Sequence, residues 1–350
     1  MRHVSLRMAA SLAAAVVLLA MASWSVSADA AGKRIGIAAR EIVNDYNRGI
    51  IEGAKKVLEG AGDTVVVVDG QSDPRKHNDN IENLINSHVD GIIIQLGDAQ
   101  QMAPAVAKAT AAGIPVLTTS VGALTPGALT DVGGDDSLMA ALMTRALLSS
   151  INYKGDVYVF WVPGAPLLET RKRILEAMVK DYPQVKLHFV PTEHSAAKVQ
   201  SQMEDILTAN PDPGSIAGVW GAYDLLTSGA VQAIRQAGRS DIKVASIDGD
   251  HVGFQMLLED GSPFVATVVQ DVPNIGALAG TTMLQALGGK KDFPSALFTD
   301  AYIAIHANGV AAAEKRWGKD VWTQIQIDPK DVAKRWPQTE PLLVVRPTLP

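Results

Sequence analysis

The chain has 350 residues, a formal net charge of −6 and no cysteine, and 47% of its residues are hydrophobic and 19% charged. The acidic balance argues against nucleic acid and anionic membranes as partners. The missing cysteines exclude disulfides, thiol chemistry and a cysteine-borne lipid anchor, although a chain of this length can bury a core without cross-links. The length and the ordinary globular composition predict two domains.

The first thirty residues resemble a secretory signal peptide. Arg2 and Arg7 precede an apolar stretch over residues 8–24, and residues 28–30 form a small-x-small cleavage pattern. A membrane anchor is the alternative, but the apolar stretch is short for a spanning helix. We therefore expect export to the periplasm with cleavage near Ala30. The mature chain would carry a charge of −7, because two arginines and one aspartate are removed from a chain of −6.

Short β-branched runs then alternate with segments of helical period. The expected strands of a first set lie at 34–39, 64–69, 91–95 and 114–120. The segment after the first of them places Ile50, Ala54 and Leu58 on one helical face. The strands are nearly continuous hydrophobic runs, as a sheet covered by helices on both faces requires. The fold class is therefore α/β with parallel strands.

A second set of strands follows residues 132–136, where a glycine pair and two acids interrupt the periodicity. The expected strands of this set lie at 156–161, 185–190, 216–220, 242–247 and 264–269. Two similar α/β lobes are the simplest account. Several strands of both sets end in polar or aromatic residues: Arg40, Asp69, Gln95, Ser120, Trp161, Asp248 and Gln270. Ligands bind outside the carboxyl ends of parallel strands, so we expect a site in a cleft between the lobes.

A segment that begins at Asp248 nearly fits a calcium-binding loop. Asp248, Asp250, Gly253 and Glu259 fall at the first, third, sixth and twelfth positions of an EF-hand loop. Val252 supplies no side-chain oxygen at the fifth position, and the segment follows a strand where an EF-hand needs a helix. We therefore expect no metal here. Asp250 is expected to cap the next helix, which leaves Asp248 at the strand end.

Signatures of catalysis are scarce in this sequence. It has no phosphate-binding glycine-rich loop with lysine, no GxSxG and no GxGxxG, and the histidines after residue 30 lack the i, i+4 spacing of a helical metal site. The pattern favours binding over turnover, with no enzyme activity and no cofactor expected. A periplasmic enzyme whose residues converge only in space remains an alternative.

Five segments carry a family likeness. They are "RIGIAAREIVNDYNRGIIEGAKKVLEGAG", "VVVDGQSDPRKHNDNIENLINSHVDGIIIQ", "AGIPVLTTS", "GVWGAYDLLTSGAVQAIRQAGRSDIKVASIDGD" and "FVATVVQDVPNIG". In this order they resemble the type I periplasmic sugar-binding proteins of ABC importers, in particular the ribose-binding branch. The resemblance covers residues 33–309 with few gaps. The resemblance identifies the family specifically but gives little information about the identity of the ligand.

The resemblance implies two Rossmann-like lobes with parallel sheets, joined by a three-strand hinge. The N-terminal lobe would comprise residues 31–134 and 271–300, and the C-terminal lobe residues 135–270 and 301–330. The crossovers would lie near Gly134–Asp135, Gln270–Asp271 and Asp300–Ala301. The chain from Gly309 onward runs past the usual family end, and residues 331–350 would form a C-terminal extension that wraps a lobe.

The resemblance also implies ligand contacts from both lobes. Carried over position by position, they are Arg40, Asn44, Tyr46, Asn47, Gln95, Ser120, Arg171, Tyr223, Asp248 and Gln270. Ser120 and Val121 stand where ribose binders carry an Asp-Arg pair, a departure that puts ribose itself in doubt. Arg173 competes with Arg171 for the role of ligand arginine.

Three further residues join these positions, and two of them are open to two interpretations. Asp224 follows Tyr223 and is a candidate helix cap. Trp161 and Trp220 stand at strand ends, where each either stacks on the ligand or packs under the sheet.

The implied function is that of a non-enzymatic, monomeric receptor that binds a sugar, a polyol or a related small polar solute and delivers it to an ABC permease in the inner membrane. Carboxylates accept hydroxyl donors, and arginine and asparagine donate to hydroxyl oxygens. Arg40 and Arg171 together also permit an anionic ligand. The alternatives are an exported sensor that presents its ligand to a membrane receptor, and a receptor for a non-carbohydrate metabolite. A ligand-responsive regulator is disfavoured by the export signal and by the lack of a helix-turn-helix.

Overall fold

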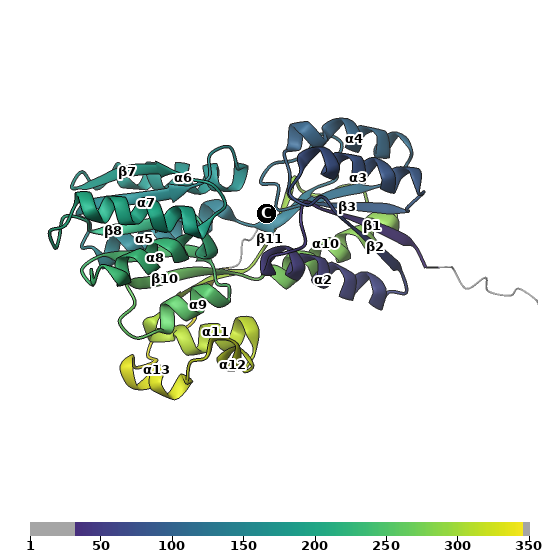
Figure 1. Ribbon diagram of the computed structural model, residues 1–350. Coiled ribbons are helices and arrows are strands. Elements are labelled where there is room, and N and C mark those ends of the chain that lie inside the picture. The colour runs from purple at the N-terminus through teal and green to yellow at the C-terminus, as the bar shows by residue number, and fades with distance from the viewer. Residues whose placement is uncertain (1–31, 346–350) are drawn as a thin grey trace, which may run out of the picture.

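The structure is a computed structural model that describes residues 32–345. The expected signal peptide and the end of the expected extension, residues 346–350, lie outside the described residues. Two α/β lobes lie side by side, and strand β11 (Ala296–Thr299) runs where they join (Figure 1). None of the helices within residues 32–345 combines the length and the apolar character needed to span a bilayer.

The first lobe is built on a six-stranded, wholly parallel sheet. In spatial order its strands are β11, β5 (Asp131–Gly134), β4 (Val116–Thr119), β3 (Gly91–Gln95), β1 (Arg34–Ala39) and β2 (Thr64–Asp69). Helices α2 (Asp45–Gly60) and α10 (Val272–Leu287) cover one face, and α3 (Pro74–Asn86) and α4 (Ala99–Ala111) cover the other (Figure 1). Because both faces are covered, the central strands β1 and β3 are buried along nearly their whole length.

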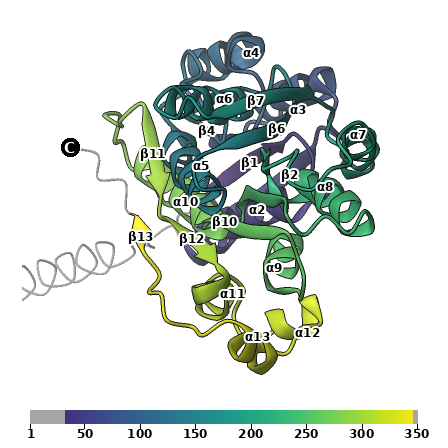
Figure 2. The same ribbon diagram turned by 90° about the vertical axis from the view of Figure 1, so that its left-hand side faces the viewer.

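The second lobe is built on a seven-stranded sheet. In spatial order its strands are β13 (Val344–Val345), β12 (Ala301–Ile305), β10 (Phe264–Gln270), β9 (Lys243–Asp248), β8 (Gly218–Gly221), β6 (Gly155–Trp161) and β7 (Val185–Pro191). One face packs on α5 (Asp136–Ser150) and α6 (Pro166–Val179), and the other on α7 (Ala196–Ala209), α8 (Asp224–Gln236) and α9 (His251–Leu258) (Figure 2). Strands β12 and β13 are antiparallel to their neighbours, and the others are parallel. The predicted α/β fold with two parallel-stranded lobes is confirmed.

The chain passes between the two sheets three times. It leaves the first sheet after β5, returns after β10, and leaves again between β11 and β12. Residues 132–136 interrupt the periodicity in the sequence, but residues 131–134 form β5, which pairs with both β4 and β11. A four-residue strand that ends in two glycines has no apolar run by which its pattern could be recognised.

The C-terminal segment packs on the second lobe. After a short 3₁₀ turn, η1 (His306–Asn308), it forms α11 (Gly309–Trp317), α12 (Val321–Ile325) and α13 (Pro329–Arg335), which lie next to α9 (Figure 2). Ala312, Val321 and Val332 are buried in the same core as Phe254 and Leu258 of α9. The segment ends as β13 on the sheet, where Val344 pairs with Tyr302.

Helices α2 and α10 approach each other through glycine, which yields a stability prediction. A Cβ atom added at Gly276 would lie 2.0 Å from the carbonyl oxygen of Ile50, whereas one added at Gly60 would meet no atom of the described residues within 4 Å. Gly276→Ala should therefore lower the free energy of unfolding by about 1–3 kcal/mol through overpacking. Gly60→Ala should be neutral or stabilise by about 0.4–1 kcal/mol. Urea unfolding of both variants measures the difference, and equal effects would contradict the described α2–α10 packing.

Candidate ligand-binding site between the lobes

Strand ends of both lobes meet at the interlobe space. In the first lobe, Arg40, Gln95 and Ser120 stand at or directly after the ends of the neighbouring strands β1, β3 and β4. In the second lobe, Asp248 and Gln270 are the last residues of the neighbouring strands β9 and β10. The sheets thus bring residues far apart in the sequence to one place, as expected for parallel α/β folds.

Several interactions cross this space. Oδ2 of Asp45, at the start of α2, lies 3.2 Å from Nδ1 of His251, at the start of α9. Burial, and after it the positive charge of Arg40 in the other lobe, lower the pKa of His194. The opposite walls of the cleft therefore lie within electrostatic reach of each other.

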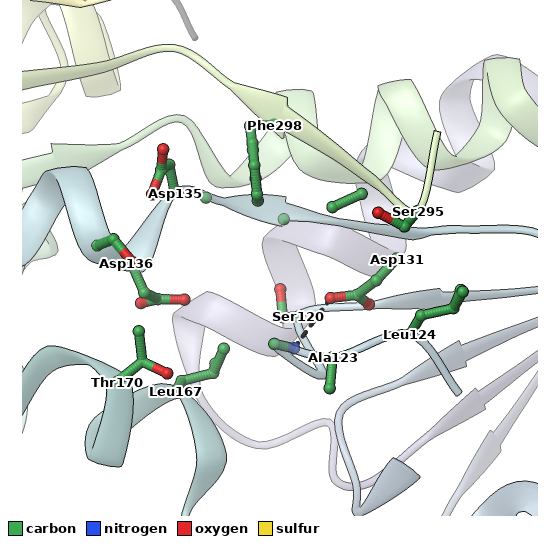
Figure 3. Close-up of a pocket in the computed structure, with 15 residues that line it drawn as sticks. Ser120, Ala123, Leu124, Asp131, Asp135, Asp136, Leu167, Thr170, Ser295 and Phe298 are labelled. Carbon is green, nitrogen blue, oxygen red and sulfur yellow. Dashed lines mark hydrogen bonds between the residues drawn. The ribbon is translucent and has the colours of Figure 1, made fainter. Parts of the chain in front are cut away.

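A cavity of about 280 Å³ lies beside these strand ends, against the segments that connect the lobes. Figure 3 shows Ser120, Leu124 and Asp131 of the first lobe facing Asp136, Leu167 and Thr170 of the second, with Phe298 of β11 on a third side. The loop after β4 is fixed by the buried Asp131 carboxylate, which accepts hydrogen bonds from the backbone N–H groups of residues 121 and 122.

A buried arginine organises the wall of the second lobe. Arg171 of α6 is only 3% exposed. Its Nε donates to Oδ1 of Asp136 at 2.7 Å, and its Nη1 donates to the carbonyl oxygen of Ala222 at 2.6 Å. Nη1 also lies 3.7 Å from Oδ1 of Asp248. Burial opposes the charged form, but Asp136 and Asp248 outweigh it and raise the pKa of Arg171, so the guanidinium is charged.

Asp248 is the acid at the end of β9. Its backbone φ is +136°, a region that side-chain-bearing residues rarely adopt and that is over-represented at functional sites. Its Oδ1 accepts a hydrogen bond from Nε2 of Gln270 at 2.7 Å. Burial raises the pKa of Asp248 to about 6, against the opposing effect of Arg171.

Asp224 has a different role from the expected helix cap. The N-cap residue of α8 is Tyr223, and it makes no side-chain capping bond. The Asp224 side chain is fully buried and accepts hydrogen bonds from the hydroxyls of Ser246 and Thr267 and from the N–H group of Gly249. It therefore ties the ends of β9 and β10 together and supports the backbone that follows Asp248.

The predicted cap by Asp250 is present, since its Oδ1 accepts from the N–H group of Gly253 at 2.7 Å.

Polar groups of the first lobe form the opposite wall. The hydroxyl of Tyr46 donates to Oγ of Ser120 at 2.8 Å, and Nε2 of Gln95 donates to the carbonyl oxygen of Asn47 at 3.0 Å. The side chain of Asn44 caps α2 by accepting from the N–H group of Asn47. Oδ1 of Asn47 and Oε1 of Gln95 are buried and have no hydrogen-bond donor among residues 32–345. Buried acceptors of this kind call for an outside donor.

The aromatic candidates separate into different environments. Trp220 is fully buried under the sheet, where its Nε1 donates to Thr144, so the packing interpretation holds for it. Trp161 is 9% exposed, and its Nε1 donates to Glu169 at 3.1 Å. The hydroxyl of Tyr223 lies 2.9 Å from Nδ1 of His194.

Two further acids, Asp136 and Glu41, lie at the cleft, and neither is among the site residues predicted from the sequence. Asp136 was seen only as part of a glycine-acid break, and its link to Arg171 spans 35 residues. Glu41 follows Arg40 and accepts hydrogen bonds from the side chains of Asn44 and Asn47. The one sequence feature that could have pointed to these acids is their position, because each stands just after the end of a strand.

Two lobes joined at three crossovers, with a polar cleft at facing strand ends, are the architecture of a solute-binding protein. The family model described as periplasmic binding protein domain matches residues 35–291, and the chain belongs to this family. The predicted likeness to type I periplasmic sugar-binding proteins is thereby confirmed, and with it the role of a solute-binding component in transport.

Named relatives agree with this assignment. The chain is 29% identical over 277 residues to the ribose import binding protein of Bacillus subtilis, covering 77% of this chain and 87% of the relative. It is 25% identical to the xylitol-binding protein of Mycolicibacterium smegmatis, over 80% of this chain and 79% of the relative. The crystal structure of an ABC transporter solute-binding protein from Agrobacterium vitis with bound allitol superposes with a TM-score of 0.74 at 26% identity, covering 85% of this chain and 99% of that chain.

The buried ion pairs predict unequal roles for the two competing arginines. Arg171→Leu leaves the buried carboxyl groups of Asp136 and Asp248 unpaired and should cost about 3–5 kcal/mol of unfolding free energy near neutral pH. The exposed Arg173, whose side chain contacts Thr170, is the matched control. Arg173→Leu should change stability by less than about 0.5 kcal/mol.

The loss of unfolding free energy caused by Arg171→Leu, its stability deficit, should also depend on pH. Without the guanidinium, burial raises the pKa of both carboxyl groups further, so the folded variant holds protons that the unfolded chain releases. Its stability should then fall as the pH rises, and the deficit should be larger at pH 8 than at pH 5. Denaturant unfolding of both variants at the two pH values is the measurement. A deficit independent of pH would show that lost packing, rather than unpaired charge, is the cause.

Proposed function

We propose that this protein binds a neutral sugar or polyol in the interlobe cleft, in the periplasm, and delivers it to the permease of an ABC importer. The observation that carries the proposal is that polar groups of the two lobes face each other: Arg171 lies beside Asp248 in the second lobe, and Tyr46 of the first lobe lies within electrostatic reach of both. The named relatives, which include a xylitol-binding protein and a solute-binding protein with bound allitol, support a polyhydroxylated ligand.

The charges of the cleft favour a neutral ligand over an anionic one. Arg171 is already paired with Asp136 and lies close to Asp248. Its positive charge is thus neutralised within the protein. The two ionised carboxylates carry two negative charges, one more than the guanidinium balances. Arg40 adds a positive charge, but Glu41 stands next to it in the sequence. A sugar acid would bring another negative charge to a site with no net positive charge to receive it.

The hydrogen-bonding groups of the cleft suit hydroxyls. An ionised carboxylate such as Asp248 accepts from two hydroxyl groups, and an arginine donates to hydroxyl oxygens. In the first lobe, Asn47 and Gln95 add buried acceptor oxygens that have no donor in the described part of the chain. We propose as ligand contacts the full set Arg40, Asn44, Tyr46, Asn47, Gln95, Ser120, Arg171, Tyr223, Asp248 and Gln270, with Asp136 as the partner of Arg171.

The proposed ligand differs from ribose. The hydroxyl of Ser120 is engaged by Tyr46, and the side chain of Val121 is 1% exposed. Neither replaces the Asp-Arg pair that the ribose-binding branch is expected to carry there. Residues 31–134 with 271–300 and residues 135–270 with 301–330 would act as the two rigid lobes, and ligand contacts to both would favour the closed state.

A ligand screen tests this function. Thermal unfolding of the mature chain would be measured with pentoses, hexoses, polyols and sugar acids. A ligand at a hundred times its Kd adds about 2.7 kcal/mol and should raise the midpoint by about 5–10 °C, since each kcal/mol corresponds to about 2–4 °C. Neutral sugars or polyols should give shifts, and sugar acids should not. Shifts from sugar acids alone would overturn the charge argument, and shifts only from unrelated metabolites would overturn the ligand class. Recovery of a chemically altered ligand would show turnover in place of binding.

The affinity for such a ligand should depend on pH through Asp248. Its pKa is about 6 in the free protein, and hydroxyl donors bind the ionised form better. Affinity should therefore be full above about pH 7 and fall by up to about tenfold per pH unit as the pH drops below 6. Calorimetric titration measures this dependence. The variant Asp248→Asn should bind weakly at every pH, and wild-type affinity in this variant would remove Asp248 from the site.

A further inference from the structure

The C-terminal segment reaches the loop that carries the proposed ligand carboxylate. The family match ends at residue 291, whereas α11 begins at Gly309. At the end of α11, Nε1 of Trp317 donates to the carbonyl oxygen of Gly249 at 3.0 Å. Gly249 directly follows Asp248, so the contact lies one residue from the candidate site.

The peptide groups of Gly249 are held on both sides. Its N–H group donates to Oδ2 of Asp224 at 2.8 Å, and its carbonyl oxygen accepts from Trp317. Its φ is +66°, and a Cβ atom there would lie 2.6 Å from Val269, so only glycine fits this turn. The direction in which the Asp248 side chain leaves the strand therefore depends on two anchors, and one of them belongs to the C-terminal segment.

Trp317 also supports a contact between the lobes. Its ring stacks on the imidazole of His251, with ring centroids 3.9 Å apart. The guanidinium of Arg316 lies 3.9 Å from the centroid of the same ring. The imidazole in turn lies 3.2 Å from Oδ2 of Asp45, on the other side of the cleft. The ring of Trp317 thus fixes the orientation in which His251 meets the first lobe.

We propose that Trp317 is a positioning residue of the ligand site: it holds the loop from Asp248 to His251 and thereby orders the Asp45–His251 contact that draws the two lobes together. This inference rests on the proposed function, since closure serves ligand capture. Trp317 itself touches no ligand in this proposal and acts through Gly249 and His251.

The chain supplies a matched control. Trp322 of α12 belongs to the same C-terminal segment, and its Nε1 also makes one hydrogen bond, to Oε1 of Glu314 at 3.0 Å. Trp317→Phe and Trp322→Phe each remove one indole N–H donor and keep an aromatic ring. A purely structural role for the segment predicts similar effects of both variants on the cleft, whereas the positioning role predicts an effect of the first alone.

The test measures the distance between the lobes in the ligand-free protein. The chain has no cysteine, so Gln101→Cys in α4 and Asp205→Cys in α7, both exposed, give two spin-labelling sites on different lobes. Trp317→Phe and Asp45→Ala should each shift the distance distribution towards the open state, and Trp322→Phe should not. Because Trp317 acts through the Asp45–His251 contact, the double variant should open no further than Asp45→Ala.

Each outcome decides the proposal. The proposal fails if Trp317→Phe has the same distance distribution as the wild type. It also fails if the two tryptophan variants shift the distance equally, or if the shifts add in the double variant. If a sugar or polyol binds, Trp317→Phe should weaken its affinity by up to about fivefold, because the ligand must then also order the loop and close the lobes. If none binds, the proposed function fails, but the distance comparison still stands because it uses ligand-free protein.

Discussion

Burying the guanidinium of Arg171 is costly unless carboxylates neutralise it and its N–H groups find acceptors. Asp136 at the start of α5 and the carbonyl of Ala222 after β8 meet these needs, and Asp248 at the end of β9 lies 3.7 Å from the same guanidinium. The three groups come from separate strand-to-helix connections. One buried charge therefore sets the relative positions of these connections, and a ligand meets a wall whose polar groups are already oriented.

The two acids at the end of β9 and the start of α8 show how environment divides similar side chains between roles. Asp224 is fully buried and saturated by two hydroxyls and a backbone N–H group, so it serves the backbone. Asp248 has Gln270 as a donor and the charge of Arg171 nearby, and it keeps acceptor capacity for hydroxyl groups. The first acid makes the strained conformation of the second sustainable.

The fold could be predicted because buried parallel strands such as residues 91–95 are unbroken apolar runs, and local pattern suffices to find them. Position at a strand end was also enough to propose Asp248 and Gln270. The local sequence pattern did not reveal roles that depend on hydrogen-bond partners far away in the sequence. The role of Asp224 depends on Thr267, 43 residues further on, and a cap was the local interpretation. Trp317 meets Gly249 across 68 residues, a contact that no periodicity encodes.

The pairing of β13 with β12 has a consequence for the solubility of the protein. Strand β12 would otherwise be the outermost strand on that side of the second sheet, with unpaired backbone groups open to another chain. Val344 and Val345 cover part of it. The last described residues thus protect the sheet from edge-to-edge aggregation. A shorter chain without β13 would keep the whole cleft but would expose the edge of β12, on which copies could associate.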